Sequence, residues 1–333
     1  MTAPIFTLTM NNDVAHASSE NGCCSAGWAN WVWLFLWACA ISAVFATPTA
    51  AVQLTGDDTG PQVTLSAAEV DTGGTLLVRI DCRRMPAAGS VPNVSFGDQV
   101  VYLFPHPGQA KGVYAGVVGI PLAVRPGPAA LTVAWGDGAQ RGSETVAFVI
   151  QPGTYGEETL TVDPRHVRPS PKDLERIRRE QAELKQIYAS GSRGRLWQGR
   201  FQVPVPGEMH GPFGTRRLFN NELQSHHTGV DFRAQTGDPI HAAGAGVVRL
   251  SKDLFYSGNA VVIDHGAGVF TSYSHLSRID VKVGQRIEKG QAVGLAGATG
   301  RVTGPHLHWG VKVNSVNVNP LTFIQVIDRL GGG

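Results

Sequence analysis

Histidine and aspartate residues cluster in the last third of the chain at spacings that suit metal binding. Of the 11 histidines in the 333-residue sequence, eight lie between residues 200 and 325. In H-T-G-V-D, His227 and Asp231 are four residues apart and can share one face of the backbone. In H-L-H, His306 and His308 project from the same face of a β-strand. Neutral imidazoles and carboxylates are zinc ligands, so these motifs predict a metal site.

A catalytic zinc ion requires three protein ligands and one open position. His227, Asp231 and one histidine of the H-L-H pair supply three ligands. The other histidine of the pair and His275, in S-Y-S-H-L-S, then remain free to transfer protons beside a zinc-activated water. The spacing leaves open which of His306 and His308 binds the metal. The set predicts a zinc hydrolase without a catalytic glutamate, and the chain contains no H-E-x-x-H motif.

The sequence leaves open the roles of three further side chains near these motifs. His210, in G-E-M-H-G-P-F-G, could line the substrate groove. Tyr273 either points into the site beside His275 or packs within its strand. Arg216 is expected to make a structural or groove-lining contact near the site. His265 falls at the end of a predicted strand and is expected to be structural.

The elements that must position this site are β-strands. Residues 200–325 contain short apolar runs separated by glycine, with a helical pattern only at the end, in L-T-F-I-Q-V-I-D-R-L. Two segments share a turn–strand–glycine rhythm, namely T-G-D-P-I-H-A-A-G-A-G-V-V and V-G-Q-R-I-E-K-G-Q-A-V-G-L-A-G. We therefore expect a C-terminal all-β domain with duplicated hairpin motifs.

The preceding residues predict a second β domain and a linker. Residues 52–150 contain strand-like runs between turn-formers, as in an immunoglobulin-like β-sandwich. Residues 151–199 read as a linker whose first part, to residue 169, is rich in proline and expected to be irregular. A helix is expected at residues 171–189, capped by Ser170 and with an apolar stripe that packs on a neighbouring domain. The stripe consists of Leu174, Ile177, Leu184 and Tyr188.

Residues 1–50 contain an apolar run at residues 26–46 that reads as a signal peptide or membrane anchor. This predicts export to the periplasm or cell envelope, with membrane contact if the segment is not cleaved. No Lys or Arg occurs before Arg79, so the usual basic residues of a signal are missing.

Composition narrows the classes of partner and metal ligand. The net charge is +2, with no basic patch interleaved with aromatic residues, which argues against nucleic-acid binding. The four cysteines are Cys23, Cys24, Cys39 and Cys82, and without the N-terminal segment only Cys82 remains. A metal site must therefore be built from histidines and carboxylates.

Together, these motifs resemble a known enzyme family. Residues from about 207 to 320 resemble the LytM/lysostaphin-type zinc peptidases, which cut peptide cross-links of bacterial peptidoglycan. The resemblance rests on G-P-F-G-T-R-R, H-T-G-V-D-F, Y-S-H-L-S, V-K-V-G-Q-R-I-E-K-G-Q-A-V-G-L-A-G-A-T-G and T-G-P-H-L-H-W-G-V, in the family's order. It implies that His227, Asp231 and His308 bind Zn²⁺ and that His275 and His306 are catalytic. The implied substrate is the peptidoglycan stem peptide.

Two functions other than an endopeptidase are compatible with a fold of this kind. Some proteins of similar fold are non-enzymatic adaptors that activate a cell-wall amidase, and these typically lack metal or catalytic residues. This chain keeps all five, which favours an enzyme. A wall-binding module with a structural zinc would need a fourth protein ligand, and only three obvious candidates are present. The β-sandwich could position the enzyme, cover its groove or bind an envelope protein.

Overall fold

The computed structural model describes residues 52–54, 60–85, 91–136 and 141–331. The predicted signal or anchor, with Cys23, Cys24 and Cys39, lies outside this part of the chain. Among the described residues, no helix has the length and apolar character needed to cross a membrane. The described residues group into one unit by their internal contacts.

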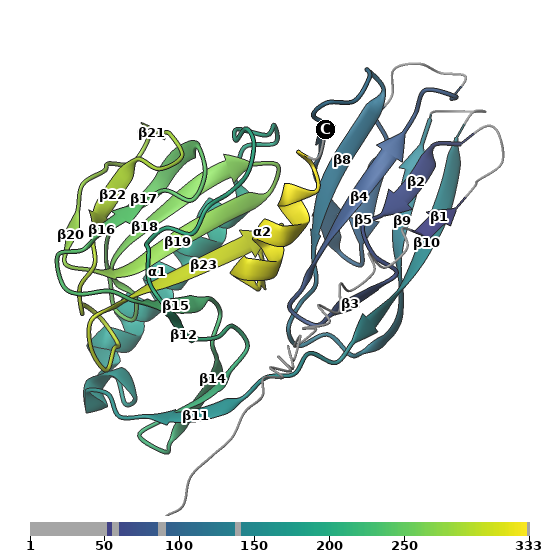
Figure 1. The fold of residues 1–333 in the computed structure, drawn as a ribbon. Helices are drawn as coiled ribbons and strands as arrows, with labels where there is room; N and C mark the ends of the chain where they lie inside the picture. The colour runs from purple at the N-terminus through teal and green to yellow at the C-terminus, as the bar shows by residue number, and fades with distance from the viewer. Residues whose placement is uncertain (1–51, 55–59, 86–90, 137–140, 332–333) are drawn as a thin grey trace, which may run out of the picture. The chain divides into compact units, whose positions relative to one another are not determined.

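The N-terminal domain consists of two five-stranded sheets (Figure 1). The first sheet has the order β1 (Val52–Leu54), β2 (Gln62–Leu65), β4 (Thr75–Asp81), β8 (Val113–Gly119), β7 (Leu103–Pro105). The second has the order β3 (Glu69–Asp71), β10 (Gly142–Gln151), β9 (Gly127–Trp135), β5 (Asn93–Phe96), β6 (Gln99–Val101). Buried side chains from both sheets, such as Ile80 and Leu131, form one core. The predicted sandwich architecture is present, while the immunoglobulin-like topology stays a prediction.

The C-terminal domain is also mainly β. Its large sheet has eight strands, seven in one path and β24 (Val316–Val318) paired to β23. The path is β12 (Met209–Gly211), β15 (Val230–Arg233), β23 (His306–Val313), β19 (Val269–Leu276), β18 (Gly258–Gly266), β17 (Gly246–Leu254), β21 (Arg286–Ile287). A smaller sheet contains β16 (Pro239–His241), β22 (Ala292–Leu295) and β20 (Arg278–Ile279). Helix α2 (Pro320–Asp328) follows, where the sequence showed its helical pattern. The mostly β fold is confirmed.

The two similar sequence segments pair with each other reciprocally. β16, from the first segment, pairs with β22, from the second. β17, which begins in the first segment, pairs with β21, from the second. Each segment thus contributes one strand to the large sheet and one to the small sheet, and the duplication ties the two sheets together.

The linker departs from the prediction in its first part. The expectation that residues 151–169 are irregular is wrong, because they contain β11 (Glu157–Leu160) and a short 3₁₀ helix, η2 (Pro164–His166). β11 pairs in parallel with β13 (Arg216–Phe219), which pairs with β14 (Leu223–His226). A short strand whose partner lies far along the chain leaves little local pattern, and the surrounding prolines and glycines mask it.

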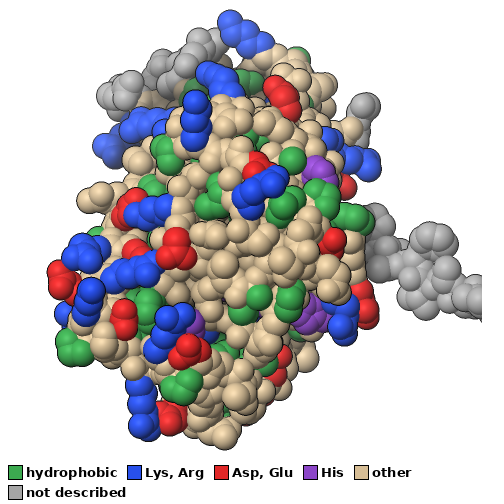
Figure 2. Space-filling view, turned by 90° about the vertical axis from the view of Figure 1, so that its left-hand side faces the viewer, with side chains coloured by type: hydrophobic (Ala, Val, Ile, Leu, Met, Phe, Trp, Pro, Cys, Tyr) green, Lys and Arg blue, Asp and Glu red, His purple; other side chains and the backbone are tan. Residues whose placement is uncertain are grey.

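Helix α1 (Pro171–Ala189) covers part of the large sheet. The hydroxyl of Ser170 accepts a hydrogen bond from the backbone of Asp173 and caps its first turn. Leu184 and Tyr188 pack against a cluster that includes Phe270. Ile177 is also buried, whereas Leu174 is 40% exposed, so the predicted stripe holds from Ile177 onward and not at Leu174. Figure 2, which views the molecule from the left-hand side of Figure 1, shows acidic and basic side chains next to one another on the face turned to the viewer.

The sandwich and the C-terminal domain share a hydrophobic core. Phe104 of the sandwich lies edge-on to Trp197, with ring centroids 5.4 Å apart. The side-chain amide of Asn314 donates to the carbonyl of Val117 at 2.8 Å. The sandwich therefore packs directly on the domain that carries the predicted site.

His265 is a buried titratable group in the core of the C-terminal domain. It is fully buried on β18, and its Nδ1 lies 2.8 Å from the carbonyl oxygen of Ala245. Its Nε2 lies 2.8 Å from the Thr271 hydroxyl. Burial lowers the pKa of His265 to about 4. The folded protein thus holds this imidazole neutral, in keeping with a structural role.

We predict that His265 makes the fold acid-sensitive. An unfolded histidine titrates near pH 6.5, so between about pH 6.5 and 4 the unfolded chain binds more protons than the folded one. The free energy of unfolding should be highest above this window and fall within it as the pH drops, by up to about 3 kcal/mol. Denaturant unfolding at pH 7.5 and pH 5, with metal removed by chelation, measures this loss.

The matched variants are His265→Gln and His226→Gln, a buried and an exposed histidine. The first should be less stable at pH 7.5 but lose less stability on acidification than the parent. The second should keep the parent's pH dependence. Equal pH dependence in all three proteins would contradict the assignment.

Candidate metal and catalytic site

The predicted ligands meet where β15 and β23 pair. In this antiparallel pair, Asp231 lies directly opposite His308. His227 precedes β15 and reaches the same place through a bend at Gly229. A Cβ at Gly229 would lie 2.4 Å from the carbonyl oxygen of Trp309, so a side chain there would push this bend away from β23. Strand register and one glycine therefore bring the three side chains together.

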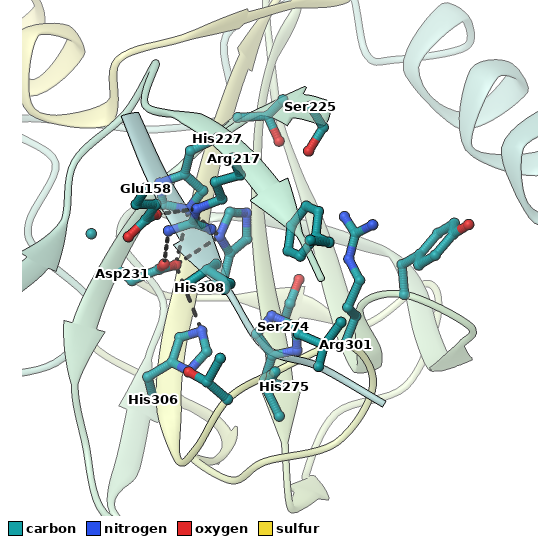
Figure 3. Close-up of a pocket in the computed structure, with 18 of the residues that line it drawn as sticks. Glu158, Arg217, Ser225, His227, Asp231, Ser274, His275, Arg301, His306 and His308 are labelled. Atoms are coloured by element: carbon teal, nitrogen blue, oxygen red, sulfur yellow. Dashed lines mark hydrogen bonds and ion pairs between the residues drawn. The ribbon is translucent and has the colours of Figure 1, made fainter. Parts of the chain in front are cut away.

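One atom from each predicted ligand contributes to a compact triangle (Figure 3). Asp231 Oδ1 lies 3.0 Å from His227 Nε2 and 2.9 Å from His308 Nδ1, and the two nitrogens are 2.9 Å apart. The edges of a tetrahedral zinc site with ordinary bond lengths are about 3.3 Å. His227 Nδ1 lies 2.8 Å from the Pro212 carbonyl, to which it donates in the neutral form, leaving the Nε2 lone pair free. The group could hold a metal ion, and its donor atoms fit one.

His306 and His275 lie beside the triangle, and each has its Nδ1 next to a backbone carbonyl. His306 Nδ1 is 2.9 Å from the carbonyl of Gly304, and His275 Nδ1 is 2.8 Å from that of Thr299. When neutral, each ring donates through Nδ1 and keeps a lone pair on Nε2. Their ring centroids are 4.8 Å apart. His306 Nε2 lies 3.7 Å from Asp231 Oδ1, farther than the nitrogens of the triangle.

Burial sets the protonation of these imidazoles. It lowers the pKa of His275 well below the ordinary value, and protonation of His306 or His308 would lower it further. Burial also lowers the pKa of His306 and of His308. At neutral pH the rings are therefore neutral, which is the form that binds a metal or accepts a proton.

Asp231 is ionised despite its burial. Burial by itself raises the pKa of this carboxyl, but its close contacts with the His227 and His308 imidazoles outweigh burial and hold the pKa well below the ordinary value. Its second oxygen, Oδ2, accepts a hydrogen bond from Arg217 Nη2 at 2.7 Å. Arg217 Nε in turn donates to Glu158 of β11. One carboxylate oxygen thus faces the two imidazoles of the triangle, and the other faces the guanidinium of Arg217.

The site opens into a cavity of about 290 Å³. His210, whose role the sequence left open, lines it, with its ring centroid 5.7 Å from that of His306. Arg301 forms another part of the wall and stacks on Phe219, with its guanidinium 4.0 Å from the ring centroid. Tyr273 is fully buried, with its hydroxyl 2.8 Å from the Ala243 nitrogen, so the packed alternative is the observed one.

Comparison with known proteins agrees with this geometry. Residues 225–320 match the family model described as Peptidase family M23. A crystal structure of a putative peptidase M23 from Pseudomonas aeruginosa matches at a TM-score of 0.59 and 34% sequence identity. The match covers 77% of this chain and 95% of that chain. The chain belongs to peptidase family M23.

Curated relatives match the M23 part of the chain. Peptidoglycan DD-endopeptidase ShyA of Vibrio cholerae serotype O1 is 42% identical over 123 residues, which are 37% of this chain and 29% of ShyA. DD-carboxypeptidase/endopeptidase Mpg of Neisseria meningitidis serogroup B is 38% identical over 123 residues, 37% of this chain and 26% of Mpg. The matched region is less than a third of either relative's length.

The sequence motifs did not identify Arg217 and Glu158 as part of this M23 site. They singled out Arg216, whose side chain is 42% exposed and pairs with Glu157. The Arg217 side chain, one residue later on β13, is 13% exposed and contacts Asp231. Strand alternation separates the two arginines, but the sequence does not show which one faces inward. No sequence pattern pointed to Glu158 as part of the site, because strand β11, which carries it, was not expected.

We predict that Arg217 positions Asp231 for metal binding. In Arg217→Ala, Oδ2 loses its charged partner, the carboxylate is freer to turn, and metal affinity should fall about 10- to 100-fold. Competition with a chelator of known affinity measures the change. The matched control is Arg216→Ala, which removes the neighbouring arginine, and its affinity should stay within about threefold of the parent. Similar losses in both variants would refute the role.

Proposed function

We propose that this M23 protein is a zinc-dependent endopeptidase that hydrolyses peptide cross-links of bacterial peptidoglycan. The observation that supports this most directly is the triangle of His227, Asp231 and His308 with two further neutral imidazoles beside it. The name of ShyA points to peptidoglycan as the substrate, and the names of both ShyA and Mpg include an endopeptidase activity. The proposal includes action in the periplasm or cell envelope, and membrane attachment through residues 26–46 if they are not cleaved.

Zinc suits the proposed ligand set of two imidazole nitrogens and one carboxylate oxygen. Three protein ligands leave a position open for a reactant, whereas a structural zinc site is closed by four. When bound, zinc supplies Lewis acidity, which polarises the scissile carbonyl and eases deprotonation of the attacking water.

The two other histidines move the proton in this proposal. His306 accepts it from the attacking water at Nε2, because its Nδ1 hydrogen is held by Gly304. The nearby Asp231 carboxylate favours the resulting imidazolium, which then donates to the departing amide nitrogen. His275, more deeply buried and held by Thr299, stays neutral and orients the water by accepting its second hydrogen.

The cavity and charge distribution suit a peptide. Arg217 and Arg301 supply hydrogen-bond donors along the cavity wall, and the neutral imidazoles supply acceptors at Nε2. The net charge of +2 and the mixed charges seen in Figure 2 fit a small peptide substrate better than a polyanion. We further propose that the β-sandwich, which packs against the M23 domain, contacts an envelope partner. A non-enzymatic adaptor would need none of the five site residues, so their convergence supports catalysis.

The first test is digestion of purified sacculi by the zinc-loaded protein, with released fragments identified by mass. The parent should release uncrosslinked peptides, and Asp231→Ala should release none, because it loses a ligand. Chelation should abolish release by the parent and zinc should restore it. No release from a protein that binds zinc tightly would overturn the endopeptidase and favour the adaptor.

A second test separates catalysis from metal binding. His306→Ala should keep zinc affinity within a fewfold of the parent, because His306 is not in the ligand triangle. Its turnover on sacculi should fall about 10²- to 10⁴-fold, the usual effect of removing a general base. Zinc affinity lost in parallel with activity would show instead that His306 is a ligand.

A further inference from the structure

A second cavity adjoins the M23 site. Its volume is about 140 Å³, and it shares four lining residues with the catalytic cavity: Thr228, Ser257, Ser274 and His308. From His308 it continues along β23 to Lys312. We call it the Lys312 cavity. Because the proposed metal ligand His308 lines both spaces, the Lys312 cavity extends the space available to a bound substrate.

The floor of the Lys312 cavity is one face of the large sheet. Alternation along β23 places His308, Gly310 and Lys312 on this face. On β19, Ser274 pairs with His308 and Ser272 pairs with Gly310. A Cβ at Gly310 would lie 2.6 Å from the Ser272 hydroxyl, so a side chain there would crowd the floor. The floor is thus open between His308 and Lys312 and carries serine hydroxyls.

The roof comes from linker helix α1. Leu184 and Tyr188 line the cavity from this helix. The Tyr188 ring lies edge-on to Phe270, with centroids 5.2 Å apart, which fixes the ring beside the cavity. The linker therefore encloses a space that the sheet alone would leave open.

Lys312 places a positive charge there without an anionic partner. Its Nζ lies 4.9 Å from the Tyr188 ring centroid. Within the described part of the chain, no carboxylate forms an ion pair with its ammonium. Burial lowers the pKa of Lys312 to about 8, so the side chain is still mostly charged at neutral pH. A cation–π contact offsets only part of the cost of burying an ammonium.

We propose that the Lys312 cavity is a subsite that binds a carboxylate of the substrate peptide, about four residues from the bond that is cut. This proposal rests on the proposed function. The spacing follows from β23, because four strand residues from His308 to Lys312 span roughly 13 Å and an extended substrate advances about 3.3 Å per residue. Ser272 and Ser274 offer hydroxyl donors along the way.

Two parts of a peptide could supply this carboxylate, namely its C-terminus or an acidic side chain. The test uses three synthetic cross-linked stem-peptide dimers. One has all carboxylates free, one has its C-terminal carboxylates replaced by carboxamides, and one has its side-chain carboxylates so replaced. Binding to the zinc-loaded full-length protein is measured by calorimetry, and cleavage is followed as kcat/KM.

For the parent, one of the two amidated dimers should bind and react about 10- to 100-fold less well than the free acid, the loss expected for a charge-assisted hydrogen bond. That dimer identifies the source of the carboxylate. Lys312→Met, which keeps a long apolar stem against Tyr188, should lose affinity for the free acid by the same factor. It should no longer distinguish acid from amide, whereas Lys312→Arg should keep much of the preference.

Lys252→Met is the matched control, because Lys252 lies near α1 but pairs with Glu183 outside the cavity. It should behave as the parent. Equal discrimination by the parent and Lys312→Met, or none by the parent, would overturn the subsite. Lys312-dependent binding without cleavage would preserve the subsite and refute the endopeptidase, so the two failures are distinguishable. Unchanged zinc affinity and melting temperature would show that Lys312→Met is folded.

Discussion

The buried carboxylate of Asp231 is the constraint around which the site is arranged. Removing a charge from water costs several kcal/mol unless that charge is well paired, and this carboxylate is 3% exposed. One oxygen faces His227 and His308, and the other faces Arg217. The arrangement depends on strand register, since a one-residue slip of β15 would turn Asp231 to the opposite face.

The linker is part of the site rather than a spacer. Its strand β11 supplies Glu158, which holds the guanidinium of Arg217 behind Asp231. Its helix α1 supplies Tyr188, which encloses the Lys312 cavity. One connecting segment therefore supports the proposed metal ligands from one side and bounds the substrate space on another. A shift of this segment would therefore alter both the support of Asp231 and the shape of the Lys312 cavity.

One face of β23 carries most of the proposed chemistry. Successive inward positions are His306, His308, Gly310 and Lys312. In order, they provide a proton acceptor, a metal ligand, open space and a positive charge. Because one rigid strand carries all four positions with a two-residue period, it fixes the spacing between the proposed reacting centre and the positive charge of Lys312.

The sequence by itself determined the β-rich fold, the span of helix α1 and the five histidine and aspartate residues that meet at the site. These features have local causes: strand alternation, a capping serine and short motifs within single strands. Only the tertiary structure decided which of two adjacent arginines faces Asp231, that β11 exists, and that Lys312 lies in a cavity beside His308. The partners of Glu158 and Lys312 lie 59 and 124 residues away, at Arg217 and Tyr188. Such contacts arise from strand pairing and packing between distant segments, which local pattern does not specify.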